Sequence, residues 1–386
     1  MIKMLTAYTT ELDDVDAAVS EILGQLDLEH NLLCNSVGIM SFYSEFLETG
    51  VVKALSDALP FDVIGGTTSN VAVPGAIGDI MLALTVLTSD DARFAAGASA
   101  PLHDDAREPV TELYSRINLS SSGKPALLLV YAPVVSNNIN GDDLIEALDA
   151  VSGGVPVFGT LAFTHLSDFS GIYTCFNGEQ YADCMSVIAI YGDVKPEFLR
   201  TPTPEVQMIP HKTTITRAVR NEILEMNGQP AIDYLQSIGI IGHGSAAGIV
   251  SIPFVVTLRD GSRVVRSPYK ILDNGHLLFN GAVPEGSHVG FSNFEMDFVI
   301  ASAGKILMAA IKKARPNNAM LLFSCVARKW ALGAQFHAEM EKIDGCLNGT
   351  RKYQLAYSGG EICPARNDKG ELVNRFHNYT LIGCLL

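Results

Sequence analysis

Small and polar residues that follow apolar, strand-like segments are the most promising chemical groups in this sequence. They form two groups, Gly65, Gly66, Thr67 and Ser69 in the first and Ser358, Gly359, Gly360 and Glu361 in the second. Since glycine has no Cβ, a ligand can approach main-chain N–H groups closely at such positions, which predicts ligand binding. The alternative is that the glycines form bulges or tight bends where a sheet curls. Both interpretations stay open for these groups, and the bend is favoured at a third place, Gly159-Thr160.

Motifs that would indicate catalysis are missing from the sequence. The glycine-rich run at 239–248 has neither the Gly-x-Gly-x-x-Gly spacing of a dinucleotide site nor the Gly-Lys-Ser/Thr of a P-loop. Ser245 within it lacks the Gly-x-Ser-x-Gly frame of a nucleophile elbow. No His-Glu-x-x-His motif or close Cys/His cluster supports a zinc site. We therefore predict a protein that is not an enzyme.

A hydrolase or transferase is the alternative, with the strand-end glycine and serine loops as an oxyanion site. The members of a catalytic triad meet in space rather than along the chain, so spacing does not test this alternative. Its structural signature is a nucleophile, Ser69, Ser245 or Ser358, within hydrogen-bond reach of a histidine that a carboxylate orients. A third hypothesis, a purely structural interaction module, predicts no enclosed pocket.

Composition argues against several classes of partner. The 386 residues carry a formal net charge of −15, and no Lys/Arg cluster reverses that sign locally, which argues against nucleic acid. The longest apolar run, at 126–135, is far shorter than a membrane span, so membrane insertion is not expected. The N-terminus lacks the apolar stretch and cleavage site of a signal peptide, which predicts a cytoplasmic location.

An apolar strand, an amphipathic helix and a second strand that ends in small residues recur three times. The copies cover residues 37–69, 126–160 and 319–361, and one more apolar strand follows each of them, at 79–88, 184–191 and 376–386. We predict an α/β fold of repeated strand-helix-strand units with mixed sheets, in two related halves. The glycines Gly65, Gly159 and Gly360 are expected at equivalent places in the three copies.

A different pattern separates the second and third copies. A linker-like stretch with prolines lies at 203–210. Apolar residues at helical spacing then predict a helix over 215–226, and Pro230 is expected to open a second helix. Asp260-Gly261-Ser262 and Asn274-Gly275 predict hairpin turns between strands.

Several segments resemble FIST domains, a family of intracellular sensory modules with an N-terminal and a C-terminal half. They are Glu225-Met226-Asn227-Gly228-Gln229-Pro230, Val283-Pro284-Glu285-Gly286-Ser287, Phe323-Ser324-Cys325-Val326-Ala327-Arg328, Tyr357-Ser358-Gly359-Gly360-Glu361-Ile362-Cys363-Pro364 and Phe376-His377-Asn378-Tyr379-Thr380. The N-terminal match is looser, because Asn70-Val71-Ala72 stands where the family has Gly-Glu-Ile. The resemblance implies an N-terminal FIST domain over 1–200 and a C-terminal FIST domain over 201–386.

The resemblance implies small-ligand sensing, with no reaction attached. Many members carry output domains, whereas this chain ends at Leu386, so the resemblance implies signalling in trans through a histidine kinase or a cyclic-dinucleotide enzyme. Stand-alone members include haem-binding proteins that sense nitric oxide and regulate a histidine kinase. Haem is therefore the expected cofactor, and an amino acid or another small metabolite is the alternative ligand.

Four residues complete the predicted site. His377, in the family motif, and His243, between two glycines, are the candidate axial ligands of a haem. The alternative for His377 is a hydrogen bond that orders a loop. Arg328 is expected to pair with a carboxylate, either of a propionate or amino acid or of an internal residue such as Glu361. Asn378, next to His377 in the motif, belongs to the predicted ligand-binding set.

Overall fold

A computed structural model gives an α/β protein with several mixed sheets, as the sequence predicts. It describes the chain except for residues 104, 119–122, 134–138, 166–169, 205–207, 243–251, 293 and 314–318. Within the described ranges, no helix is both long and apolar enough to cross a membrane.

The three predicted copies build three sheets on one plan. In each sheet an edge strand pairs with an antiparallel strand, which pairs with the first of two parallel strands. In this spatial order the strands are β1 (Lys3–Thr9), β6 (Leu82–Ser89), β2 (Asn35–Phe42) and β3 (Val63–Thr67); β7 (Arg93–Ala98), β12 (Ser186–Tyr191), β8 (Leu127–Ala132) and β9 (Val157–Leu161); and β13 (Glu197–Arg200), β28 (Leu381–Leu385), β22 (Met320–Cys325) and β23 (Tyr353–Ser358). The predicted repeat is therefore confirmed.

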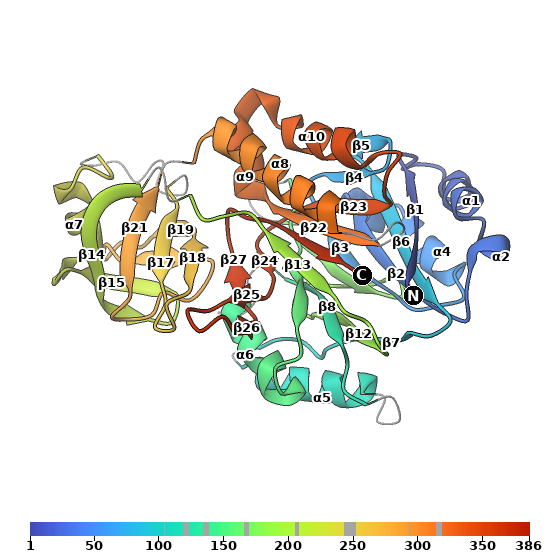
Figure 1. The fold of residues 1–386 in the computed structure, drawn as a ribbon, viewed down its shortest axis with the longest axis horizontal. Helices are drawn as coiled ribbons and strands as arrows, with labels where there is room; N and C mark the ends of the chain where they lie inside the picture. The colour runs from blue at the N-terminus through green and yellow to red at the C-terminus, as the bar shows by residue number, and fades with distance from the viewer. Residues whose placement is uncertain are drawn as a thin grey trace.

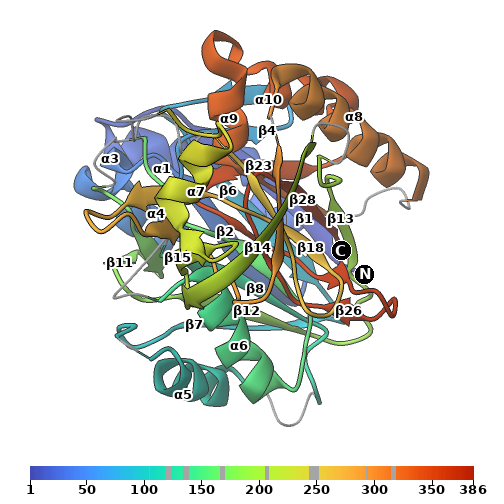
Figure 2. The same ribbon diagram turned by 90° about the vertical axis from the view of Figure 1, so that its left-hand side faces the viewer.

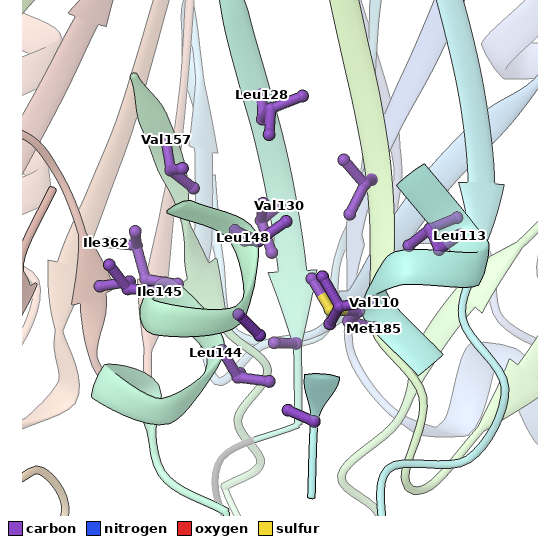
Figure 3. Packing of buried hydrophobic residues seen from close by; sticks show 14 of the residues in the cluster. Val110, Leu113, Leu128, Val130, Leu144, Ile145, Leu148, Val157, Met185 and Ile362 are labelled. Carbon is purple, nitrogen blue, oxygen red and sulfur yellow. The ribbon is translucent and has the colours of Figure 1, made fainter. Parts of the chain in front are cut away.

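Helices cover the outer face of each sheet. They are α1 (Val15–Leu26), α2 (Leu28–Asn31), α3 (Glu45–Glu48) and α4 (Val51–Asp57) in copy 1, α5 (Arg107–Ile117) and α6 (Gly141–Ser152) in copy 2, and α8 (Met296–Lys313), α9 (Val326–Leu332) and α10 (Ala338–Leu347) in copy 3. Figure 3 shows this packing in copy 2, where Leu144 and Leu148 of α6 face Val130 of β8. A capping box between Asn140 and Asp143 fixes the start of α6, because it satisfies backbone N–H groups that the helix leaves free.

The inner faces of the three sheets share one buried cluster. Ile39 from copy 1, Phe158 from copy 2 and Phe323 from copy 3 belong to it, so the sheets enclose a common core. A polar network crosses this core, because the Tyr131 and Ser41 hydroxyls lie 2.6 Å apart and Gln354 donates to the Ser41 oxygen at 2.7 Å. We call the three sheets and their helices the three-sheet body.

Each sheet is completed by a hairpin from another copy. The hairpin of β4 (Val71–Val73) and β5 (Ala76–Gly78) leaves copy 1 and pairs with β23 of copy 3. In the same way, β10 (Thr174–Phe176) and β11 (Glu179–Tyr181) join β3 of copy 1, while β24 (Glu361–Ile362) and β27 (Phe376–His377) join β9 of copy 2. A small pair, β25 (Ala365–Arg366) and β26 (Leu372–Val373), lies within the last connection. The copies are therefore interlocked in a cycle.

A separate β-rich unit is inserted between β13 and α8. It contains β14 (Met208–Val219), β15 (Glu222–Met226), β16 (Gln229–Pro230), α7 (Ala231–Ser237), β17 (Phe254–Thr257), β18 (Arg263–Arg266), β19 (Pro268–Ile271), β20 (Leu277–Phe279) and β21 (His288–Ser292). Figure 1 shows this β-unit at one end of the molecule, and Figure 2 views the molecule from that end. Its core is centred on Phe254, Phe279 and Phe291.

The helix predicted over 215–226 is wrong, because this segment forms β14 and β15. Arg220, at φ 55°, turns the chain between the two strands, and β-branched threonines and isoleucines suit an extended backbone. The predicted hairpin turns are confirmed: Gly261 and Gly275 adopt φ values of 75° and 80° between β17 and β18 and between β19 and β20. Pro230 precedes α7, as predicted.

Candidate functional site

The ends of the parallel strands of the three copies meet at one end of the three-sheet body. Phe163, after β9, donates its backbone N–H to the Thr67 carbonyl of copy 1 at 2.9 Å. Gly359, after β23, donates to the Leu161 carbonyl of copy 2 at 3.0 Å. Tyr357 donates to the Asn70 carbonyl at 3.1 Å and so closes the ring between copies 3 and 1. Side chains from distant parts of the sequence therefore converge at this end of the body.

A pocket of about 530 Å³ lies over this ring, between the three-sheet body and the β-unit. Its described lining comprises Pro133, Phe163, Ser170, Gly171, Ile172, Tyr173, Ala182, Ser267, Tyr269, Asn280, Cys325, Val326, Ala327, Trp330, Gly359 and Asn378. Ser267, Tyr269 and Asn280 belong to the β-unit, and the others belong to the three-sheet body. The volume is in the range of pockets that bind small molecules.

Two predicted site residues, Gly359 and Asn378, line this pocket. Asn378 is only 1% exposed, and its side-chain carbonyl accepts a hydrogen bond from the Ser267 N–H of the β-unit at 3.4 Å. It therefore joins the two bodies at the pocket wall. Its role in ligand binding stays a prediction.

The first predicted group lies one layer behind the pocket. The Thr67 hydroxyl accepts the backbone N–H of Tyr173 at 3.0 Å, and the Thr67 N–H donates to the Tyr173 carbonyl at 2.9 Å. A Cβ on Gly66 would lie 2.9 Å from the Tyr131 ring and 3.1 Å from the Tyr173 carbonyl oxygen. Ser69 is buried, and its hydroxyl has no partner within the described residues. These residues position the pocket wall and do not line it.

Gly65 and Gly159 occupy equivalent places, but Gly360 does not. Gly65 pairs with Met40 and Gly159 pairs with Val130 in the parallel strands of copies 1 and 2. A Cβ at these glycines would lie 2.2 and 2.1 Å from the carbonyl oxygens of those two partners. Gly360 follows the end of β23 and packs against Phe376 instead, so the expected threefold equivalence is wrong. The neighbouring strand therefore requires glycine at 65 and 159 whether or not a ligand binds nearby.

Glu361 lies inside the protein, next to the pocket residue Cys325. Its two carboxyl oxygens accept hydrogen bonds from Ser358 at 2.6 Å and from Thr380 at 2.7 Å. Burial raises the pKa of Glu361 to about 8, although these hydrogen bonds act in the opposite direction. Burial also raises the pKa of the Cys325 thiol, and the nearby Glu361 adds to the effect. A protonated thiol of this kind is a poor nucleophile at neutral pH.

Arg328 is committed to an internal partner. Its guanidinium is fully buried and donates to the Oε1 atom of Glu339, with the Nη2 contact at 2.5 Å. Arg328 Nη2 also donates to the Val299 carbonyl at 2.9 Å. The internal pairing that the sequence left open is therefore observed, with Glu339 in place of Glu361. The Arg328 guanidinium is therefore not available to bind the carboxylate of a propionate or an amino acid.

His377 does not fit the role of a haem ligand. The side chain is fully buried, its Nε2 atom lies 3.0 Å from the Cys363 carbonyl oxygen, and it does not line the pocket. Burial lowers the pKa of His377 well below its ordinary value, and the cation of Arg200 adds to this effect, so the ring is neutral. This geometry matches the alternative that His377 orders a loop. His243, the other candidate, lies outside the described residues.

The hydrolase alternative requires a candidate serine hydrogen-bonded to a histidine. Two of the three candidates, Ser69 and Ser358, lie within the described residues, and neither shows this bond. The Ser358 hydroxyl bonds Glu361 at 2.6 Å and lies 3.3 Å from the Ser324 carbonyl oxygen, and the Ser69 hydroxyl has no partner among the described residues. Ser245 is outside the described residues, so whether the protein is an enzyme stays a prediction.

Sequence reasoning missed the aromatic side chains of the pocket. Phe163, Tyr173, Tyr269 and Trp330 come from four separate segments. The one available signal was Trp330, the single tryptophan of the chain, which follows the family-like segment ending at Arg328. It is 51% exposed and packs edge-on against Phe163, with ring centres 6.1 Å apart.

The remote similarities to solved structures include the following two. Cyanuric acid hydrolase from A. caulinodans is 13% identical, with a TM-score of 0.26, over 50% of this chain and 71% of that chain. PurLQS from Thermotoga maritima is 8% identical, with a TM-score of 0.20, over 100% of this chain and 72% of that chain. Neither TM-score is high enough to carry an argument. A search of curated proteins gives no match.

Family models give a clear result. The model of the FIST N domain matches residues 37–229, which is half of the chain, and the model of the FIST C domain matches residues 233–364. The two matches cover all three sheets and the β-unit in large part. The chain therefore belongs to the FIST family, whose domains are associated with small-ligand sensing in signalling proteins.

Proposed function

We propose that this protein senses a small molecule that binds in the pocket between the three-sheet body and the β-unit. The observation that carries the proposal is that both bodies line one pocket, through Tyr269 and Asn280 on one side and Trp330 and Gly359 on the other. A ligand that contacts both bodies favours the arrangement in which both contacts are made, and this differential binding is what a sensor requires.

A charged contact beside the pocket connects the β-unit to the three-sheet body. Arg266 of the β-unit is fully buried and donates two hydrogen bonds of 2.9 Å to the carboxylate of Asp142 in the three-sheet body. It also donates to the Phe376 carbonyl at 2.8 Å. We propose that the ligand changes how the β-unit is held about this contact. The altered surface would then be read in the cytoplasm by a separate protein, such as a histidine kinase or a cyclic-dinucleotide enzyme.

A thermal-shift screen tests the proposal. The library contains neutral, zwitterionic, anionic and cationic metabolites, and hits are repeated on Ala327→Phe, which fills the pocket. Ala17→Phe, on the exposed side of α1, is the matched control. We expect hits that raise the melting temperature of the wild type and Ala17→Phe but not of Ala327→Phe. A screen without hits, or hits that persist in Ala327→Phe, would contradict the proposal.

Haem is not part of the proposal, because His377 is buried, bonded through Nε2 to the Cys363 carbonyl, and absent from the pocket lining. Reconstitution with haem and His243→Ala gives a direct check of the remaining candidate ligand. A saturable Soret band in the wild type that disappears in His243→Ala would restore haem as the cofactor.

A further inference from the structure

The charge of the pocket lining restricts the ligand. None of the lining residues that the structure describes is Lys, Arg, Asp or Glu. Cations next to the lining residues have other partners: Arg266 pairs with Asp142, Arg328 pairs with the buried Glu339, and Lys329 Nζ bonds Asn70. A charged group placed in the pocket would therefore lose hydration without gaining a counter-charge from the described lining.

The aromatic rings favour a flat ligand. Phe163 and Trp330 form one edge-on pair in the three-sheet body, and Tyr173 and Tyr269 add two more rings, the second from the β-unit. Aromatic faces and edges gain most from other planar rings, since stacked and edge-on arrangements both match their charge distribution. Trp330 lines the pocket and is 51% exposed, so part of its ring is open to a ligand.

The side-chain carboxamides of Asn280 and Asn378 are polar groups that a ligand in the pocket can contact. Asn378 lines the pocket from the three-sheet body and is 1% exposed, and its side-chain oxygen accepts a hydrogen bond from the Ser267 N–H. Asn280 enters the pocket from the β-unit. Each carboxamide offers N–H donors and a carbonyl acceptor, which pair with an amide or lactam edge without any net charge.

We infer that the pocket takes an uncharged planar ring compound that carries an amide-like hydrogen-bonding edge, rather than haem, an amino acid or another ionised metabolite. The inference rests on the proposed function of this pocket and narrows its ligand class. The ring system lies against Trp330 and Phe163, and the polar edge faces Asn378.

Saturation-transfer NMR with matched probes tests this inference. The probes are 1-naphthamide, 1-naphthoate and naphthalene, which share one ring system and differ in having a neutral amide, a carboxylate or no polar edge. We expect 1-naphthamide to bind wild-type protein at least tenfold more tightly than 1-naphthoate. Asn378→Leu, which keeps the volume of the side chain, should weaken 1-naphthamide severalfold and leave naphthalene unchanged. Ala327→Phe should abolish the signal of every probe.

The outcomes separate this inference from the proposed function. Binding of 1-naphthoate equal to or tighter than that of 1-naphthamide, lost in Ala327→Phe, would overturn the neutral-ligand inference and leave the pocket as a binding site. An undiminished 1-naphthamide affinity in Asn378→Leu would overturn the assigned polar edge. Failure of all probes to bind wild-type protein would also overturn the inference, whereas the metabolite screen would still decide the proposed function.

Discussion

At the scale of single residues, the ionisable side chains of the family-like motifs stabilise the fold. Arg328 pairs with Glu339, and Glu361 is held by Ser358 and Thr380. The sequence predicted a carboxylate partner for Arg328, but not which one, because Glu339 reaches it only through the packing of α10 against the sheet. Trp330 could not be assigned to a pocket from sequence, since the other aromatic residues of the pocket come from copy 2 and the β-unit.

Breaking the Arg328–Glu339 pair should destabilise the protein strongly. Both side chains are fully buried, so Arg328→Leu leaves a carboxylate without its cation and should lower the free energy of unfolding by about 3–5 kcal/mol. Replacing both residues by leucine should cost less than the sum of the two single changes, which urea denaturation would measure. Strictly additive losses would show that the pair is not coupled.

The raised pKa of Glu361 predicts a pH dependence of stability. Folded Glu361 keeps its proton up to about pH 8, whereas the unfolded carboxyl titrates near 4.5. Unfolding therefore releases a proton between these values, so stability falls as the pH rises, by up to about 1.4 kcal/mol per pH unit. Below pH 4.5 Glu361 is protonated in both the folded and the unfolded protein, and above about pH 8 it is ionised in both. Glu361 therefore makes no contribution to the pH dependence of stability outside this range.

Glu361→Gln isolates this effect, because glutamine has a similar shape and does not titrate. Melting temperatures between pH 5.5 and 8 should fall more steeply for the wild type than for the variant. The raised pKa values of Asp142 and Asp149 contribute to both proteins alike and cancel in the comparison. Parallel curves for the two proteins would refute the assignment.

At the scale of elements, sequence periodicity predicted the central strands of the three sheets and the helices that connect their parallel strands, but not the covering helices α1, α5 and α8 or the edge strands. It failed over 215–226, where apolar residues at helical spacing lie in two strands of the β-unit. Here tertiary pairing decides, because β14 bonds both β15 and β21. The strand-end glycines were recognised, but sequence did not reveal that Gly65 and Gly159 face a neighbouring carbonyl while Gly360 faces the Phe376 ring.

Gly65→Ala and Gly159→Ala should each destabilise the protein by about 1–3 kcal/mol or more. The new Cβ would meet a backbone oxygen of Met40 or Val130, which cannot move as a flexible side chain would. Gly24→Ala is the control, because this helical glycine has open space around it and alanine has the higher helix propensity. Thermal unfolding should rank Gly24→Ala at or above the wild type and both strand variants below it.

At the scale of the whole molecule, three interlocked copies and an inserted β-unit create the pocket. The exchange of hairpins could not be predicted, because nothing in the local sequence of β4 indicates that its partner is β23, far along the chain. The predicted division at 200 and 201 falls just after β13, which pairs with β28 at the other end of the chain.

This interlocking predicts that residues 1–200 do not fold alone to the structure seen here. The fragment lacks β24, which completes the sheet of copy 2, and it leaves β4 without β23. Unpaired strand edges of this kind lower stability and promote association. Circular dichroism and limited proteolysis of the fragment should show loss of cooperative unfolding relative to the full chain. A fragment that melts cooperatively near the temperature of the full chain would contradict the interlocked fold.

The central claim is that the ligand binds in the pocket between the three-sheet body and the β-unit. A spectroscopic label on the single tryptophan tests this claim most directly. Protein labelled with 5-fluorotryptophan has one labelled site, Trp330 at the pocket mouth, and should give one fluorine resonance. On titration with 1-naphthamide, this resonance should shift saturably in the wild type and in Ala17→Phe, and stay fixed in Ala327→Phe. A resonance that stays fixed while calorimetry records saturable binding to the wild type would place the ligand elsewhere and contradict the account.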